Sequence, residues 1–359
     1  MSELMAEPTA VTAPAMSVVV LAYGAEEWLH AAVAAVLASE GVEVELVVVD
    51  NGCTSDAVAT LRPDPRLRVI TPGTNTGFAG GVNLGAEAAS HDVVVMLNSD
   101  AEVEPGALAA LAAAIDDGAD LAGAVILLAD QPDLINSAGN PLHVLGLVWA
   151  GRLEQPRAGL GPDWQPATLS GACLAVRRSA WDRLGGFAEE FFAYHEDVDL
   201  CWRARQLGMR LDLVTEAGVR HHYEFSRNPR KMFLMERNRL LFVLTTYGPG
   251  TLATLALPLV AFDVALLAVA ARQGWAVEKV RGWAWLARHL PYLRDRRALV
   301  QAARTVPDRD LYPWLTATFD ARQMPLPAAG RPLQATLRAW WGLVRRISSR
   351  SRRSRPGAR

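Results

Sequence analysis

Three short, mainly apolar runs and a fourth strand-like segment occur along the first hundred residues, and helix-like segments lie between several of them. A strand that is buried on both faces of a sheet has such a continuous apolar run. The apolar runs are at residues 17–22, 45–49 and 93–97, the segment at residues 67–70 reads as a further strand, and residues 26–39 have the pattern of a helix. Strands that alternate with helices predict an α/β fold, with a doubly wound layer over roughly the first 125 residues.

The pattern is less regular from there to about residue 227. It has short strands, a turn at Asn140-Pro141 and a helix that begins near Glu196. We expect this part to complete the sheet and to build the second side of a binding cleft.

The last third of the chain has a different character. Residues 240–247 and 252–270 are strongly apolar, and the second run is close to the roughly 20 residues that cross a bilayer. Pro258 and Asp263 interrupt it. Tryptophans and arginines then interleave over residues 275–288, as at a membrane interface. This pattern predicts a membrane-associating region that spans or lies on the bilayer, with a buried helical hairpin as the alternative.

No acidic residue follows Asp320, and the chain ends in an arginine-rich segment, which favours an anionic leaflet. We therefore predict four parts. They are a flexible lead-in at residues 1–15, a catalytic domain at 16–238, an apolar helical region at 239–320 and a basic, disordered tail at 321–359.

Composition narrows the class of protein. A hydrophobic content of 51% and a net charge of −2 exclude a disordered chain and give no reason to expect nucleic acid as a partner. The three cysteines are far apart in the sequence, which indicates small core residues in a reducing compartment. The first fifteen residues have neither a basic nor an apolar segment of signal-peptide type, so we expect a cytoplasmic catalytic part.

Two segments after the second and third strands could contact a nucleotide. Asp50 follows an apolar strand and begins a dense turn cluster, where its carboxylate could bind a base or a ribose hydroxyl, or simply cap the turn. Residues 75–83 form a glycine-rich loop that could approach a ligand closely, or only connect a strand to a helix.

Two acidic sites could carry the chemistry. Asp100 ends the fourth strand and is a candidate ligand for Mg²⁺ or Mn²⁺, or a helix cap. Glu196, Asp197 and Asp199 begin a helix, where one carboxylate could act as a base, unless they only favour the helix dipole. His221 and His222 end another strand, and a neutral imidazole there could complete a metal site or be structural.

Several passages together resemble the family 2 glycosyltransferases, in particular their bacterial rhamnosyltransferase-like and galactofuranosyltransferase-like branch. The resembling passages are Val47-Val48-Val49-Asp50-Asn51-Gly52, Asn75-Thr76-Gly77-Phe78-Ala79-Gly80-Gly81-Val82-Asn83, Leu97-Asn98-Ser99-Asp100, Ser170-Gly171-Ala172-Cys173, Gly185-Gly186-Phe187 and Phe191-Phe192-Ala193-Tyr194-His195-Glu196-Asp197-Val198-Asp199-Leu200-Cys201-Trp202-Arg203. They extend over roughly residues 16 to 240.

The resemblance implies a GT-A fold, a nucleoside-diphosphate sugar donor, a divalent cation (Mn²⁺ or Mg²⁺) and inversion at the anomeric carbon. The donor would be of the dTDP-rhamnose or UDP-hexose (galactofuranose) type. The acceptor would be a glycan or a polyprenyl-linked glycan at the cytoplasmic membrane face, in cell-envelope polysaccharide synthesis.

The resemblance also implies a role for individual residues. Asp197 would be the general base, with Glu196 and Asp199 beside it, and Asp100 with His221 (or His222) would bind the metal. Residues expected on the donor side are Ala22, Tyr23, Glu26, Asp50, Asn75, Gly77, Phe78, Gly81, Asn83, Asn98, Ser99 and Asp100. Residues expected on the acceptor side are Gly171, Ala172, Glu196 and Arg203.

Two positions depart from the family pattern. Asn98 replaces the first acidic residue of the Asp-x-Asp metal motif, and Ala188 replaces an aspartate that often follows Gly-Gly-Phe.

Two other classes of protein stay open. A sugar nucleotidyltransferase would usually carry a glycine- and arginine-rich loop where residues 21–26 stand, and a non-catalytic membrane scaffold would explain the apolar run and the basic tail.

Overall fold

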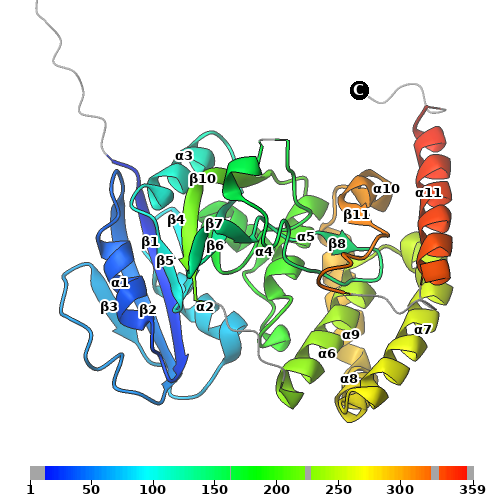
Figure 1. The fold of residues 1–359 in the computed structure, drawn as a ribbon, viewed down its shortest axis with the longest axis horizontal. Coiled ribbons are helices and arrows are strands. Elements are labelled where there is room, and N and C mark those ends of the chain that lie inside the picture. Colours follow the sequence, from blue (N-terminus) through cyan, green and yellow to red (C-terminus); the bar gives the residue numbers. More distant parts are fainter. Residues whose placement is uncertain (1–12, 162, 223–227, 325–330, 354–359) are drawn as a thin grey trace, which may run out of the picture.

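The computed structural model describes residues 13–353 except 162, 223–227 and 325–330. Its centre is a mixed β-sheet (Figure 1). The order of its strands is β3 (Leu67–Ile70), β2 (Glu43–Cys53), β1 (Ala15–Gly24), β4 (Val93–Asn98), β9 (Cys173–Arg177), β6 (Leu121–Leu128), β10 (Leu211–His221) and β5 (Ala101–Val103), and β7 (Gln131–Ser137) pairs with β6. The four predicted strands are β1 to β4, and they pair in parallel.

Helices cover both faces of the sheet, as the continuous apolar runs predict. On one face, α1 (Leu29–Leu37) and α3 (Ala107–Asp116) pack against alternate strand residues such as Val18 and Val48. On the other face, α2 (Gly77–Ala88), α4 (Arg178–Leu184) and α5 (Glu196–Gln206) pack against the intervening residues, such as Val19 and Val47. The predicted α/β class is therefore confirmed.

A helical region follows the sheet in the chain and lies beside it (Figure 1). Its elements are α6 (Pro229–Thr246), α7 (Pro249–Arg272), α8 (Ala276–Arg288), α9 (Leu290–Ala303), α10 (Asp308–Leu311), β11 (Leu315–Thr316) and α11 (Arg331–Arg353). Strand β11 pairs with β8 (Leu142–His143), and short 3₁₀ helices occur at Arg157–Gly159, Glu189–Phe191 and Tyr312–Trp314. Among the described residues, α7 is long and apolar enough to cross a membrane by length and composition.

The structure differs from the predicted division of the chain at two places. Helix α6 runs through the expected boundary between residues 238 and 239. Residues Arg331–Arg353 form helix α11, where we expect a disordered tail, because Leu337 and Trp341 are buried against other C-terminal helices. Of the expected lead-in, residues 1–12 lie outside the described part of the chain.

Candidate functional site

The carboxyl ends of β2, β1 and β4 form one edge of the sheet. Ala22 pairs with Asp50, and Leu21 pairs with Asn98, so the chain segments that follow these strands emerge side by side. Because β1 has a parallel neighbour on each side, this edge is a switch point of the sheet, where open α/β folds bind ligands. The edge is thus a candidate nucleotide site.

Asp50 is partly exposed at this edge. Its Oδ1 accepts hydrogen bonds from the backbone of Cys53 (2.9 Å) and Gly52 (3.3 Å). The carboxylate therefore does cap its own turn, which was one of the two expectations. Ligand binding by the same side chain stays a prediction.

Glu26 joins the loops that follow β1 and β4. Its Oε1 accepts hydrogen bonds from the Tyr23 backbone (2.6 Å) and from Ser99 Oγ (3.0 Å). Burial raises the pKa of Glu26, although these two hydrogen bonds act in the opposite direction. Three expected donor-side residues are thus brought together, and the neighbouring Ala22 is buried.

The glycine-rich loop is held by Asn51, a residue that we did not single out from the sequence. The Asn51 side chain is buried, its Oδ1 accepts from Thr76, and its Nδ2 donates to Asn75 Oδ1 (3.2 Å) and Gly77 O (3.1 Å). Its place directly after Asp50 at a strand end was the available signal. Asn51 fixes the shape of the loop that the donor would meet.

The small and amide residues of this loop also contribute to packing. A Cβ at Gly77 would lie 2.4 Å from Phe192 O, and one at Gly81 would lie 2.1 Å from Leu21 Cδ1. Asn83 Nδ2 donates to Phe187 O (2.9 Å), and Asn83 Oδ1 accepts from Phe187 N (3.0 Å). The Asn83 amide therefore ties α2 to the Gly185-Gly186-Phe187 turn, and nearby Phe78 packs against the Phe187 ring.

His221 faces Asp100. His221 Nε2 lies 3.0 Å from Asp100 Oδ1 and 3.3 Å from Asn98 Nδ2, and its Nδ1 lies 3.3 Å from Asn136 Oδ1. A hydrogen bond from Nδ1 to Asn136 orients the ring so that Nε2 points toward Asp100. This geometry brings together two of the expected metal ligands.

His222 is directed elsewhere. Its Nε2 lies 2.7 Å from Glu102 Oε1, and its ring stacks on Trp28 with centroids 3.5 Å apart. Successive strand residues point to opposite faces of a sheet, and the side chains of His221 and His222 likewise point in different directions. Of the two expected alternatives, the structure sets His221 beside Asp100.

Asp100 and His221 could hold a divalent ion together with ligands from outside the protein. Within the described part of the chain, no group of three or more histidine, cysteine, aspartate or glutamate side chains could hold a metal. Adjacent ligands of an octahedral ion with bonds of about 2.1 Å lie about 3.0 Å apart. The Asp100–His221 separation of 3.0 Å fits such a pair, and a diphosphate would have to supply further oxygens.

A strained loop directly precedes the second acidic site, Glu196 and Asp197. Phe192, Tyr194 and His195 all have positive φ angles (63°, 69° and 75°), a conformation that residues with a Cβ rarely adopt. Helix α5 begins directly after them at Glu196. Strain of this kind persists only where the surroundings enforce it.

Asn238 and Arg237 of α6 provide this enforcement. Asn238 is fully buried, and its Nδ2 donates to the backbone oxygens of Phe191 (2.9 Å), Ala193 (2.9 Å) and Tyr194 (2.6 Å). Its Oδ1 accepts from Arg237 Nε (2.9 Å) and Nη2 (2.7 Å). The sequence offered no clear signal for this contact, because it joins residues more than forty positions apart.

Asp197 and Glu196 have different surroundings. Asp197 Oδ2 accepts from Gly171 N (2.9 Å), and its Oδ1 accepts from Val198 N (2.7 Å). Glu196 is buried, and its Oε2 has no hydrogen-bond partner among the described residues. Burial raises the pKa of both carboxyls, that of Glu196 to about 8, and the Asp197 charge adds to the rise at Glu196. Backbone donors counteract the rise at both carboxyls, and at Asp197 they include Gly171 N and Val198 N, which favour its charged form.

Asp199 and Arg203 form a buried ion pair. Asp199 is fully buried and pairs with Arg203 Nε (2.7 Å) and with Arg296 Nη2 from α9. Burial would raise the pKa of Asp199, but the two arginines outweigh burial and keep this pKa below its ordinary value. Arg203 also donates to the backbone oxygens of Leu184 and Gly186. This buried position differs from the acceptor-side position that the resemblance implies for Arg203.

Hydrogen bonds connect the two acidic sites. Gly171 N donates to Asp197, and the next residue, Ala172, accepts through its carbonyl from Asn98 N (3.0 Å). The Asn98 side chain in turn contacts His221, which contacts Asp100. A side chain at position 171 would press on Asp197, because its Cβ would lie 3.2 Å from Asp197 Cβ.

Comparisons with known proteins give the family of the part of the chain that contains the sheet. The family model of "Glycosyl transferase family 2" matches residues 17–185. The chain is 35% identical over 210 residues to the N-acetylglucosaminyl-diphospho-decaprenol L-rhamnosyltransferase of Mycobacterium tuberculosis, which is 50% of this chain and 66% of that protein. It is 36% identical over 154 residues to the succinoglycan biosynthesis protein ExoO of Rhizobium meliloti, which is 42% of each chain. Less than two thirds of either relative is therefore covered.

Among solved structures, the mannosyltransferase PcManGT from Pyrobaculum calidifontis in complex with GDP-Man and Mn²⁺ has a TM-score of 0.48 and 19% identity, and the match covers 80% of this chain and 85% of that one. The family model spans the strand ends that carry Asp50 and Asp100, and Gly171 beside Asp197. The chain contains a glycosyl transferase family 2 domain, and its mixed sheet flanked by helices is the GT-A fold that the resemblance implies.

Proposed function

We propose that this protein is an inverting, metal-dependent glycosyltransferase of cell-envelope polysaccharide synthesis. It would move a sugar from a nucleoside-diphosphate donor to a hydroxyl of a glycan or lipid-linked acceptor at the cytoplasmic face of the membrane. The main support is the continuous set of contacts from Asp197 through Gly171, Ala172, Asn98 and His221 to Asp100. The proposed base and the proposed metal-binding pair are thus connected through residues at one edge of the sheet.

In the proposed step, Asp197 takes the proton of the acceptor hydroxyl. The acceptor oxygen forms a bond to the anomeric carbon as the bond from that carbon to the diphosphate breaks, which inverts the configuration. Asp197 suits this role because Gly171 N and Val198 N stabilise its charged form. Glu196, whose pKa is raised to about 8 by burial and by Asp197, would stay protonated near neutral pH and could donate a hydrogen bond to the acceptor.

Asp100 and His221 would hold the divalent ion. When bound, such an ion neutralises the charge that develops on the leaving diphosphate. Asn98 cannot replace the missing first carboxylate of Asp-x-Asp as a charge, but its amide contacts His221 Nε2 and helps to orient that ring. With only Asp100 and His221 as protein ligands, we expect the metal to bind weakly to the protein alone and more tightly when the diphosphate of the sugar donor is present.

The name of the M. tuberculosis relative supports a rhamnosyl donor and a polyprenyl-diphosphate-linked acceptor. A UDP-hexose or UDP-galactofuranose donor is the other expectation. Contacts at Asp50 and Glu26 would distinguish the bases and sugars, and an experiment has to choose between them.

A thermal-shift panel tests the proposal. Purified protein is melted with Mn²⁺ or Mg²⁺ and a set of nucleotide sugars that includes dTDP-rhamnose and UDP-galactofuranose. A ligand at 100 times its Kd stabilises the native state by about 2.7 kcal/mol, so a metal-dependent rise in Tm for one donor identifies that donor. Asp100→Ala is the matched variant and should lose the metal dependence. No shift with any nucleotide would contradict the proposal and favour the non-catalytic scaffold.

A further inference from the structure

Helix α7 exposes a continuous apolar stripe. Its large residues, Leu257, Val260 and Val264, are 79%, 63% and 62% exposed. Exposed alanines extend the stripe along the helix at Ala253, Ala256, Ala261, Ala265, Ala268 and Ala271. With a rise of 1.5 Å per residue, residues 253 to 271 span about 27 Å, and no charged residue interrupts the stripe. An apolar face of this length is unusual for a surface that faces only water.

The opposite face of α7 is fixed by charge. Asp263 Oδ1 lies 3.0 Å from Arg239 Nη2 and 2.7 Å from Lys279 Nζ, and both cations also contact Glu236. Lys279 is fully buried, and these four side chains join α6, α7 and α8. If α7 crossed a bilayer alone, Asp263 would enter the hydrocarbon and its partners would stay behind as unpaired buried charges, which is unfavourable. Helix α7 therefore stays packed on its neighbours and offers only its outer stripe.

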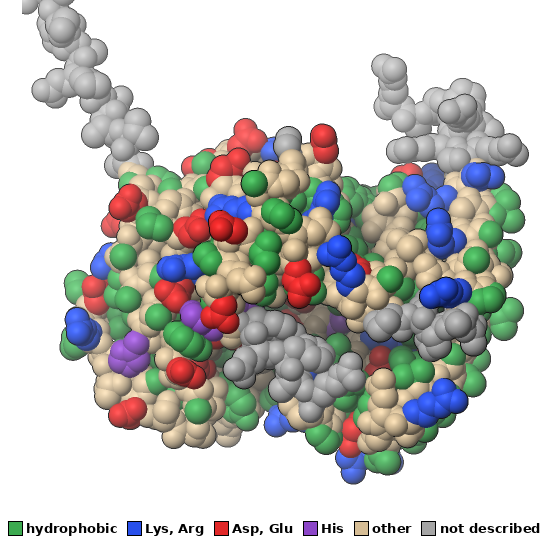
Figure 2. Space-filling view, viewed as in Figure 1, with side chains coloured by type: hydrophobic (Ala, Val, Ile, Leu, Met, Phe, Trp, Pro, Cys, Tyr) green, Lys and Arg blue, Asp and Glu red, His purple; other side chains and the backbone are tan. Residues whose placement is uncertain are grey.

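Helix α11 adds a second apolar stripe. Leu333, Trp340, Leu343 and Ile347 are between 44% and 61% exposed and recur at helical spacing on one side of α11. The core side of α11 shares a buried cluster with Leu255 of α7. Hydrophobic side chains line the edge of the molecule where these two helices lie, and arginine side chains lie beside them on the near face (Figure 2). We call the exposed apolar residues of α7 and α11 the outer edge.

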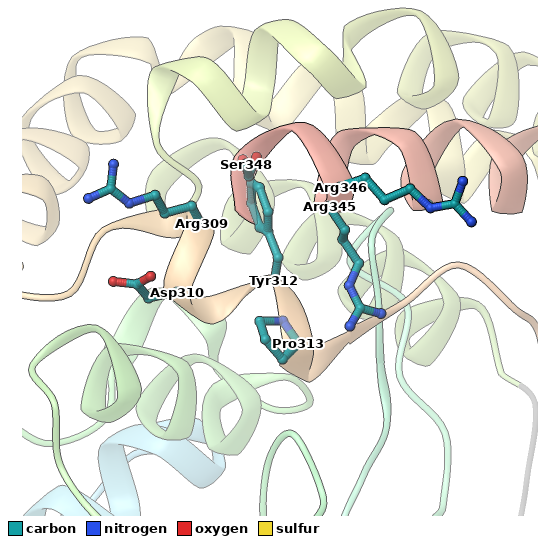
Figure 3. Close-up of a pocket in the computed structure, with 8 residues that line it drawn as sticks. Arg309, Asp310, Tyr312, Pro313, Arg345, Arg346 and Ser348 are labelled. Carbon is teal, nitrogen blue, oxygen red and sulfur yellow. The ribbon is translucent and has the colours of Figure 1, made fainter. Parts of the chain in front are cut away.

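Arginines accompany the outer edge. Arg309, Arg345 and Arg346 line a groove of about 460 Å³ between α10 and α11, and Asp310 is the one acidic residue among its lining residues (Figure 3). The chain after Asp320 contains ten arginines and no acidic residue. An apolar surface bordered by arginines is complementary to a bilayer that carries anionic phosphate headgroups.

We propose that the outer edge docks into one leaflet of an anionic membrane, with α7 and α11 lying in the interfacial plane and α7 not crossing the bilayer. The arginines of the groove would contact lipid phosphates. This inference deepens the proposed function, which places the protein at the membrane face. It rests on the proposed function only where it concerns the lipid-linked acceptor. The docking itself depends only on the helical region.

Vesicle flotation with the full chain tests the inference. The vesicles are phosphatidylcholine with or without phosphatidylglycerol. We expect binding that requires the anionic lipid. Leu257→Gln/Val260→Gln/Val264→Gln should lower the partition coefficient at least about tenfold, because exposed apolar area is lost without a change to the core. Val69→Gln is the matched control, since Val69 is 42% exposed on β3 at the far side of the sheet.

The arginines have a separate readout. Arg345→Gln/Arg346→Gln should weaken binding to the anionic vesicles about 25-fold, since each basic residue near the surface contributes about fivefold. High salt should have a similar effect, and alkaline carbonate should release the protein from membranes. Retention in the carbonate pellet, equal binding to neutral vesicles, or no binding would each overturn the inference. So would a dimer that the triple glutamine variant dissociates, because the outer edge would then be an interface between two copies.

The donor-dependent thermal shift, measured on the same variants without lipid, separates the two proposals. Absence of vesicle binding with an intact donor shift would remove the docking inference alone. Vesicle binding without any donor shift would remove the proposed function and leave the surface. Circular dichroism confirms that each variant is folded before either result is interpreted.

Discussion

The substitution Asn238→Ala tests whether α6 positions the proposed base. Asn238 Nδ2 donates to three backbone oxygens of the loop before α5. Arg237 Nη2 also donates to Phe191 O (2.9 Å), so the variant removes these donors chiefly from Ala193 and Tyr194. A buried carbonyl left without a partner costs about 1–3 kcal/mol, which sets the cost at about 2–6 kcal/mol for a rigid loop.

The loop need not stay rigid. Its three left-handed residues hold about 1–3 kcal/mol of strain each, and part of that strain is released if the loop changes conformation. We therefore expect the free energy of unfolding to fall by about 2–4 kcal/mol, below the upper limit for a rigid loop. The same relaxation moves Glu196 and Asp197, and a displacement of about 1 Å can lower kcat about 100-fold.

Denaturant unfolding and donor-turnover kinetics measure these two effects on one preparation. Thr245→Val is the control, because Thr245 is equally buried on α6 and its Oγ1 donates only within the helix, to Leu241 O (2.8 Å). It should cost about 1 kcal/mol and leave kcat unchanged. If Asn238→Ala lost stability but kept its kcat, the loop geometry would not set the position of the base. If neither quantity changed, these hydrogen bonds would not hold the loop.

Three further predictions concern the carboxylates and the histidines. Asp197→Asn should keep the donor thermal shift and lose turnover; full activity would exclude Asp197 as the base. His221→Ala should weaken the Mn²⁺-dependent donor shift as Asp100→Ala does, whereas His222→Ala should not; the reverse result would reassign the metal ligand. The native pKa of Glu196, about 8, lies above its ordinary value of 4.5, so this group makes stability fall as pH rises between those values. Glu196→Gln should flatten that part of the stability curve, measured as unfolding free energy at pH 5 and pH 8, and an unchanged slope would show that Glu196 ionises normally.

The sheet was predictable because the hydrophobic pattern of its strands agrees with their positions in the fold. Strands β1, β2 and β4 are buried along most of their length, so their sequences contain apolar runs, and the predicted strand at residues 67–70 coincides with the partly exposed edge strand β3. The ends of those runs carry Asp50 and Asp100, and parallel strands bring such ends to one edge. The positions of the candidate nucleotide and metal residues follow from this pattern with little further information.

The remaining features depend on contacts between distant parts of the chain. Nothing near Asn83 in the sequence indicates its two hydrogen bonds with Phe187, 104 residues later. Arg203 was predictable in part, because a basic residue four positions after Asp199 on a helix is suited to an ion pair. In α11, Leu333, Leu337, Trp340 and Trp341 have the spacing of a helix. The arginine-rich composition of this segment nevertheless led us to predict a disordered tail.

Helix α6 couples the proposed reaction to the proposed membrane surface. Asn238 holds the loop before α5, and the adjacent Arg239 pairs with Asp263 of α7. Neighbouring helical residues point about 100° apart, so one turn of α6 contacts both the catalytic loop and the helix with the exposed apolar stripe. Arg296 of α9 adds a second link through the buried Asp199. Because these contacts are buried and charged or multiply hydrogen-bonded, the helical region and the acidic site should move together. The orientation of the outer edge on a membrane would then also fix the direction in which Asp197 meets a lipid-linked acceptor.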